Sequence, residues 1–204
     1  MPARAITISR QLGSLGTLIA QMVAQRLEYR MVWRELINQA ARRACVPEVA
    51  LATIDDLGLL GIRPSRQAQA AYHQAIRQVM EELVAEGRVV IVGRAGQMVL
   101  RGHPEVLHVQ VIAPVAVRAE RIARRQNIPI EAALAQVTTS DRTRRNYLRR
   151  YYRARWDDPL LYDLVINTER LTPAAAAELI CLAAMQFRRT SDLDLLEELE
   201  PTLE

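Results

Sequence analysis

The chain of 204 residues contains no lysine, because all 27 of its basic residues are arginine. Any side-chain cation that contacts a phosphate must therefore be a guanidinium, which is a planar fork and not a compact ammonium. A genome that favours arginine codons would explain the bias without any functional cause. Aromatic residues are also scarce, at 4%, so aliphatic side chains must fill the core that a hydrophobic fraction of 50% allows.

Cysteine is nearly absent as well. Cys45 and Cys181 lie far apart in the sequence and match no metal-binding spacing. We interpret both as reduced core residues of a cytoplasmic protein. The sequence contains no signal peptide and no apolar run of transmembrane length. The net charge of +4 suits anionic ligands, but it does not distinguish nucleotides from nucleic acids.

Short apolar runs alternate with longer segments of helical periodicity. The run at 88–93 holds four consecutive aliphatic residues, which is typical of a strand buried on both faces. Helical spacing predicts helices over 34–45 and 65–86, and from Pro114 and Pro173 onward. The alternation predicts an α/β fold with a parallel sheet. The candidate strands are residues 4–9, 29–33, 88–93, 107–113 and 162–167.

The first apolar run leads into "RQLGSLGT" at residues 10–17, which has the outline of a phosphate-binding loop. Against the pattern G-x-x-x-x-G-K-[ST], only Thr17 matches, and Gly16 stands at the lysine position. Backbone N–H groups at a helix N-terminus can still bind a phosphate, and Gly13 and Gly16 would allow its close approach. Arg10 could supply the missing charge. An ordinary strand-to-helix turn without a ligand is the alternative.

Five segments resemble the cytidylate kinase-like family, a branch of the P-loop nucleoside monophosphate kinases. They occur in the family's order and extend the resemblance over residues 4–187, leaving an acidic tail at 188–204. The resemblance implies a three-layer P-loop kinase fold with a five-stranded parallel sheet of order 2-3-1-4-5, helices on both faces and an arginine-rich helical lid at about 127–158. The segments are "ITISRQLGSLGTLIA", "VIVGRAGQMVL", "LHVQVIAPVAVRAERI", "SDRTRRNYLRRYY" and "YDLVINTERLTPAAAAELI".

The resemblance also implies an activity and a set of site residues. The activity is phosphoryl transfer from ATP, with Mg²⁺, to CMP, dCMP or a related small acceptor, a reaction that needs alignment and charge neutralisation. Arg94 would face the acceptor phosphate, Asn167 would lie beside the donor base, and the hydroxyl of Thr17 would reach the metal. The phosphate loop would comprise Gly13, Ser14, Gly16 and Thr17, and the lid cations near the transferring group would be Arg142, Arg144, Arg145 and Arg149. Arg10, from its place at the end of the first strand, is a further candidate catalytic cation.

Three departures from the family weaken the prediction of activity. Gly16 replaces the phosphate lysine, and Leu15 stands where glycine is usual, which should limit a positive φ angle there. Trp33 and Ala95 occupy places where classical cytidylate kinases carry aspartates, although Glu35 is a possible substitute. A nucleotide-binding protein with weakened or lost catalysis is therefore an alternative. In the segment 55–67, Arg63 and Arg66 could contact an acceptor phosphate or could be ordinary surface residues.

The segment 141–156 is the most strongly charged part of the chain. Arg142, Arg145, Arg149 and Arg153 recur at helical spacing, so something acidic should face them. Nucleotide phosphates are one candidate, and neighbouring acids such as Asp141, Asp157 and Asp158 are another. The position of the segment where a lid belongs favours phosphates. Because Tyr147, Tyr151, Tyr152 and Trp156 alternate with the arginines, single-stranded nucleic acid is a less favoured second alternative.

Overall fold

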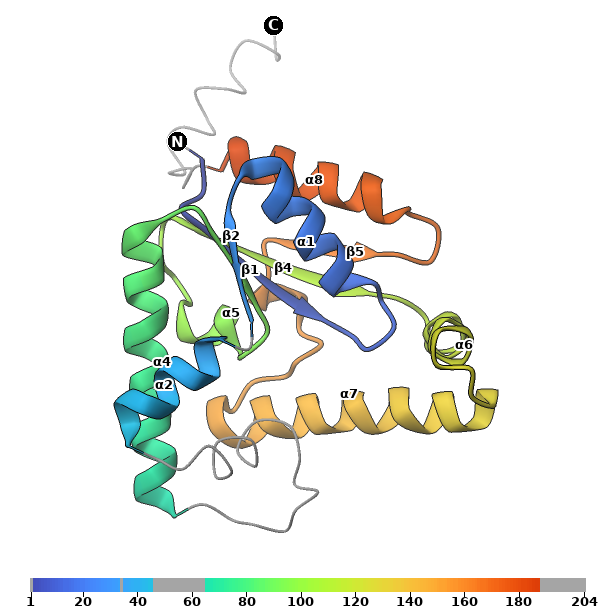
Figure 1. Ribbon diagram of the computed structural model, residues 1–204, viewed down its shortest axis with the longest axis horizontal. Coiled ribbons are helices and arrows are strands. Elements are labelled where there is room, and N and C mark those ends of the chain that lie inside the picture. The colour runs from blue at the N-terminus through green and yellow to red at the C-terminus, as the bar shows by residue number, and fades with distance from the viewer. Residues whose placement is uncertain (1, 34, 46–64, 188–204) are drawn as a thin grey trace, which may run out of the picture.

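The computed structural model describes residues 2–33, 35–45 and 65–187 (Figure 1). Its sheet contains five parallel strands in the order β2-β3-β1-β4-β5, as predicted. The acidic tail, Arg63 and most of the segment predicted as a loop at 55–67 lie outside the described residues. The strands are β1 (Ala5–Arg10), β2 (Arg30–Val32), β3 (Val89–Val92), β4 (Val106–Ile112) and β5 (Leu164–Asn167).

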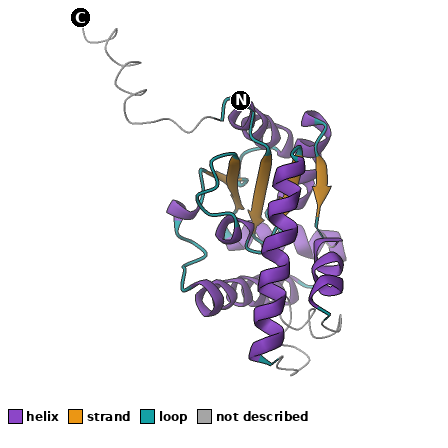
Figure 2. Ribbon diagram, turned by 90° about the vertical axis from the view of Figure 1, so that its left-hand side faces the viewer, coloured by secondary structure: helices purple, strands orange, loops and turns teal. Residues whose placement is uncertain are grey.

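Helices cover both faces of the sheet, which gives three layers. One face packs against α1 and α8 through a cluster that includes Ile8, Ile19 and Ile180. The other face packs against α4 and α5, and α2 lies on α4 (Figure 2). The helices are α1 (Gly16–Leu27), α2 (Glu35–Ala44), α4 (Arg66–Glu86), α5 (Gly96–Val99), α6 (Val115–Gln126), α7 (Ile130–Tyr152) and α8 (Pro173–Met185), with a 3₁₀ turn η2 (Pro159–Leu161).

Local signals explain where several helices begin and end. The Thr172 hydroxyl accepts a hydrogen bond from the Ala175 N–H at 3.2 Å, so it caps α8 just before Pro173. Gly87, with φ of 78°, ends α4. Arg153 was predicted to continue the arginine face of a helix, but it ends α7 with φ of 54°. The helical arginine face therefore stops at Arg149.

Because the strands are parallel, all of them end at the same edge of the sheet, where open α/β sheets bind their ligands. The 23-residue helix α7 runs beyond this edge and packs against α6 (Figure 1). The cysteine prediction was half right, because Cys181 is buried but Cys45 is exposed. Within the described ranges, no helix has the length and apolar character needed to cross a bilayer.

Candidate active site at the carboxyl edge of the sheet

The loop from Gln11 to Leu15 joins β1 to α1 in a tight turn. Both the N–H and the hydroxyl of Ser14 donate to the Gln11 carbonyl, at 3.2 and 2.9 Å. Gly13 has φ of 82° and Leu15 has φ of 64°. The expectation that leucine would limit a positive φ at position 15 was wrong. Leu15 takes the left-handed conformation as the N-cap of α1, and its side chain packs against the core on the α1 and α8 face.

Side chains hold three consecutive carbonyl groups of this loop. Arg118 Nη1 donates to the Leu12 carbonyl at 3.3 Å, and Arg121 Nη1 donates to the Gly13 carbonyl at 3.4 Å. The Thr168 hydroxyl donates to the Ser14 carbonyl at 2.9 Å. Since the N–H and C=O of one planar peptide unit point in opposite directions, the N–H groups of Gly13 and Leu15 face away from these anchors.

The N-terminus of α1 follows directly and adds further donors. Leu15 makes no side-chain cap hydrogen bond, and the first turn carries no acidic residue. The first N–H groups of a helix have no intrahelical acceptor and lie at the positive end of its dipole. The anchored loop and the uncapped helix together form a cradle of N–H donors with the properties of an anion-binding site.

Packing explains the glycine at the lysine position. A Cβ atom at Gly16 would lie 2.5 Å from the Cβ of Arg10 and 3.1 Å from the Cβ of Val111. No larger side chain fits there unless β1 or β4 moves. The Arg10 side chain continues past Gly16 to Gly93, and its guanidinium lies 5.5 Å from the centre of the Trp33 ring. The charge of Arg10 is thus directed toward the ends of β2 and β3.

A second turn, from Gly93 to Ala95, follows β3 at the same edge of the sheet. All three of its residues have positive φ, at 79°, 57° and 52°. Two of the three are not glycine, and such backbone strain is concentrated at functional sites. Arg94 is half-buried in this turn. Burial raises the pKa of Tyr147, and the nearby positive charge of Arg94 opposes part of that rise. Ala95 is buried.

The arginines of α7 line a cavity of about 250 Å³. Its wall includes the buried Trp156, whose indole N–H donates to the Ser9 hydroxyl at 2.9 Å. Because Ser9 precedes Arg10 in β1, this bond anchors the cavity wall to the strand that leads into the loop at Gln11–Leu15. The lining residues are Arg142, Arg145, Asn146, Arg149, Ala154, Arg155, Trp156 and Asp157.

Arg144 does not line this cavity. It donates to the Ser140 hydroxyl one turn earlier in α7, and its guanidinium lies 5.8 Å from the centre of the Trp156 ring. Trp156 is further fixed by its carbonyl, which accepts from Gln110 and from the Tyr162 hydroxyl, both at 3.0 Å. Burial raises the pKa of Tyr162 to about 12, so this phenol stays protonated as a donor at neutral pH.

The tyrosines of α7 are half-buried and pack against one another and against α4. The His73 ring on α4 lies 4.9 Å from the Tyr151 ring and 5.9 Å from the Tyr152 ring, measured between centroids. Burial raises the pKa of both Tyr147 and Tyr152. Stacking on nucleic-acid bases requires exposed rings, so this packing argues against single-stranded nucleic acid as the ligand.

Two further predicted residues lie at the cradle and beside it. Thr17 is half-buried in the first turn of α1, the turn that carries the N–H donors. Asn167 is exposed at the end of β5, and its side-chain oxygen accepts from the Glu169 N–H at 3.0 Å. The next residue, Thr168, is the one that reaches the loop.

Sequence reasoning missed the residues that support the loop from behind. Arg118 and Arg121 are spaced as i and i+3 in "PVAVRAERI", which puts them on one face of α6. Asp141 pairs with Arg118 from α7, and the Gln11 side chain accepts from the Ala113 N–H at 2.9 Å. The spacing of the two arginines was a signal in the sequence, but nothing nearby in the sequence identified their partners. Leu12 and Gly13, whose carbonyls they contact, each lie more than a hundred positions away.

A parallel sheet with a helix-terminal anion cradle and an arginine-lined cavity at its carboxyl edge defines the class of P-loop kinase folds. The sequence pattern of the cytidylate kinase-like family matches residues 5–170. The chain belongs to that family.

Curated relatives are similar along most of the chain, and solved structures share its fold. The chain is 27% identical over 196 residues to the cytidylate kinase of Pyrococcus horikoshii, covering 96% of this chain and 95% of the relative. It is 29% identical over 171 residues to that of Methanocaldococcus jannaschii, covering 81% and 88%. An uncharacterised protein from Eubacterium ventriosum has the same fold, with a TM-score of 0.68, 20% identity and coverage of 88% and 97%. A gluconokinase from Sinorhizobium meliloti has a TM-score of 0.50 at 14% identity, with coverage of 98% and 97%.

Proposed function

We propose that the protein transfers a phosphoryl group from ATP to a nucleoside monophosphate, with CMP and dCMP as the first candidates. The observation that carries this proposal is the N–H cradle next to the cavity lined by Arg142, Arg145 and Arg149. A cradle of this kind suits the phosphates of a donor nucleotide. Guanidinium groups can neutralise the charge on the oxygens of the transferring group, which is the main requirement of phosphoryl transfer.

The residues of the chain would divide the work between donor and acceptor. The loop N–H groups would hold the donor phosphates, while Arg142, Arg145 and Arg149 would contact the transferring group as a lid. Arg94 and Arg10 lie toward the ends of β3 and β2, where they would orient the acceptor phosphate. Bidentate guanidinium contacts fix the angle of a phosphate as well as its charge, so they can align the acceptor for attack.

Magnesium fits this site as the partner of the nucleotide. No group of three His, Cys, Asp or Glu side chains that could hold a metal occurs in the described part of the chain. Mg²⁺ commonly binds through substrate phosphates and keeps several waters, and the Thr17 hydroxyl would be its contact with this chain. When bound, the ion would neutralise negative charge on the donor phosphates.

The missing lysine favours a second candidate, a nucleotide-binding protein with weakened or lost catalysis. Gly16 leaves no cation fixed in the cradle, and the Arg10 guanidinium is directed to Trp33 instead. If the protein catalyses transfer at all, turnover would depend entirely on the arginines of α7.

The deciding experiment combines calorimetry with ATP and Mg²⁺ and an assay of phosphate transfer to a panel of nucleoside monophosphates. We expect ATP to bind weakly and CMP or dCMP to be phosphorylated. If ATP binds and no monophosphate is phosphorylated, the protein is a nucleotide-binding protein. If millimolar ATP produces neither heat nor thermal stabilisation, both candidates are wrong.

A further inference from the structure

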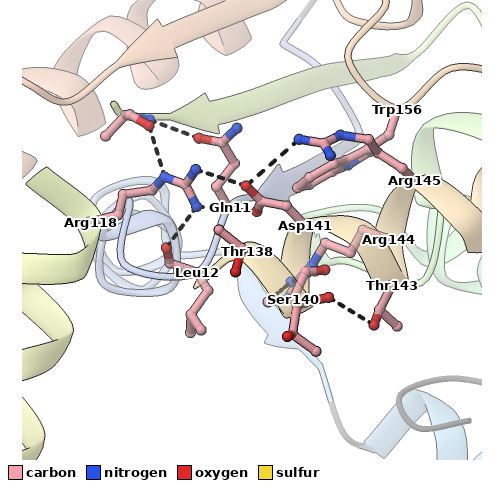
Figure 3. A network of polar contacts seen from close by, with 12 residues as sticks. Gln11, Leu12, Arg118, Thr138, Ser140, Asp141, Thr143, Arg144, Arg145 and Trp156 are labelled. Atoms are coloured by element: carbon pink, nitrogen blue, oxygen red, sulfur yellow. Dashed lines mark hydrogen bonds and ion pairs between the residues drawn. The ribbon is translucent and has the colours of Figure 1, made fainter. Parts of the chain in front are cut away.

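Arg118 is a buried cation whose donors are directed to three different parts of the site (Figure 3). Its Nε donates to the Ala113 carbonyl at 2.8 Å, and Nη1 donates to the Leu12 carbonyl at 3.3 Å. Nη1 and Nη2 also form a bidentate pair with the Asp141 carboxylate, at 3.1 and 2.8 Å. The side chains of this ion pair are 1% and 4% exposed, so neither charge is solvated.

The phosphate loop rests directly on Arg118. A Cβ atom at Gly13 would lie 2.7 Å from the Arg118 carbonyl oxygen and 2.9 Å from its Cβ. The loop backbone and the first turn of α6 are therefore packed so closely that position 13 has no room for a side chain. A shift of the loop on phosphate binding must therefore move Arg118 or be resisted by it.

On the other side of the ion pair, Asp141 also attracts an arginine of the cavity. Arg145 Nη2 lies 3.9 Å from Asp141 Oδ2, while the Arg145 side chain is 55% exposed. Arg145 lines the cavity together with Arg142 and Arg149. One carboxylate thus links a buried arginine under the loop to an exposed arginine at the cavity (Figure 3).

We propose that the Arg118–Asp141 pair couples occupation of the phosphate loop to the position of Arg145. Arg118 and Asp141 are positioning residues, and the inference rests on the proposed function because it assumes that a phosphate enters the cradle. Arg145 has two partners available, the Asp141 carboxylate and a ligand phosphate. Asp141 can release Arg145 at little cost, because Arg118 continues to neutralise the carboxylate in the buried site.

Hydrogen exchange with and without ATP and Mg²⁺ tests the coupling without requiring turnover. In the wild type, we expect ATP to slow the exchange of the amides at 13–17 and also of those at 142–149. The effect on 142–149 should be at least about fivefold, the lower end of typical coupling between sites. The test variant is Arg118→Met/Asp141→Leu, which removes both charges together and keeps apolar bulk, a replacement that buried ion pairs often tolerate.

In the folded double variant, ATP should still protect the loop but should no longer slow exchange at 142–149. Arg118→Lys provides a second test, because lysine keeps the charge and loses the fork that joins Leu12, Ala113 and Asp141.

The matched control is Arg43→Met/Glu82→Leu, which removes a bidentate pair between α2 and α4 and should respond as the wild type does. In the variants that break the link, kcat should fall while the KM for ATP stays near the wild-type value.

The outcomes separate this inference from the proposed function. If ATP fails to protect 13–17 in the wild type, the cradle does not bind nucleotide and both proposals are wrong. If the loop is protected but 142–149 does not respond in the wild type, only the coupling is wrong. The same holds if either folded Arg118 variant responds as the wild type does.

Discussion

At the scale of single residues, glycines allow the close packing of the proposed phosphate-binding loop. Gly16 and Gly13 each lie where a Cβ atom would collide with a neighbouring arginine. Gly16 faces the side chain of Arg10, and Gly13 faces the backbone of Arg118. Neither neighbour can yield easily, because the Arg10 Cβ is fixed to β1 and the Arg118 carbonyl to α6, so packing requires glycine at both positions.

Gly13→Ala tests this packing, with Gly102→Ala as its matched control. Both glycines have positive φ, 82° and 78°, but a Cβ at Gly102 would meet nothing within 4 Å. The control should therefore lose only the cost of a left-handed alanine, about 1–2 kcal/mol. Gly13→Ala should lose more stability and should also bind ATP more weakly. Urea unfolding and calorimetry measure the two effects, and equal stability losses would contradict a packing role for Gly13.

At the scale of elements, α7 has a buried apolar face and an exposed face that carries arginines. Its buried residues Ala133 and Val137 pack with α6, and Leu148 packs with Trp156 and Ala95. Its exposed arginines, Arg145 and Arg149, line the cavity. Like charges three or four residues apart repel each other by about 0.2–0.5 kcal/mol per pair, so the arginine face is maintained at a cost to the helix. An anionic ligand would relieve that cost.

Replacing Arg145 and Arg149 together with glutamine should abolish phosphate transfer and spare ATP binding at the cradle. The loop N–H groups remain, but the cations on the transferring group are lost, and one such arginine contributes about 10³–10⁵ in rate in related enzymes. The control is Arg30→Gln/Arg88→Gln, which removes two exposed arginines that pair with Glu86 and Glu28. Coupled transfer assays and calorimetry give the two readouts. A double variant that turns over normally would show that α7 does not serve as the lid.

At the scale of the whole molecule, a buried histidine makes stability depend on pH. His108 is buried, and its Nδ1 lies 2.7 Å from the Thr7 hydroxyl between β1 and β4. Burial lowers the pKa of His108, and the charge of His103 lowers it slightly further. Asp163 and the Leu100 carbonyl raise this pKa, but their effect is smaller than that of burial. The folded protein therefore holds His108 neutral where an unfolded chain would bind a proton.

The direction in which stability changes with pH follows from proton linkage. Below the ordinary histidine pKa of 6.5, the unfolded state binds more protons, so stability is complete above that pH and falls as the pH drops toward the lowered folded pKa. The slope from one group is at most about 1.4 kcal/mol per pH unit. Thermal unfolding between pH 7.5 and 5 should show a shallower loss for His108→Asn than for the wild type. Identical slopes would exclude His108, leaving His73, whose pKa burial also lowers.

The sequence by itself determined the fold to a large extent. Consecutive aliphatics at 89–92, helical periods between the strands, and caps such as Thr172 and Gly87 are local signals, so the elements and the parallel sheet could be predicted. The glycines of the loop were also visible. Hydrophobic periodicity and cap preferences act over a few residues, which is why a single chain reveals them.

The tertiary structure alone decided how the site is held. Arg118 and Arg121 reach loop carbonyls that lie more than a hundred positions away in the chain, and Thr168 reaches one farther still. The Arg10 guanidinium lies on Trp33 and not in the cradle, and Leu15 takes a positive φ because its side chain is packed against the core. Charges and hydrogen bonds carry no periodic signature, and their partners depend on how whole elements pack against one another.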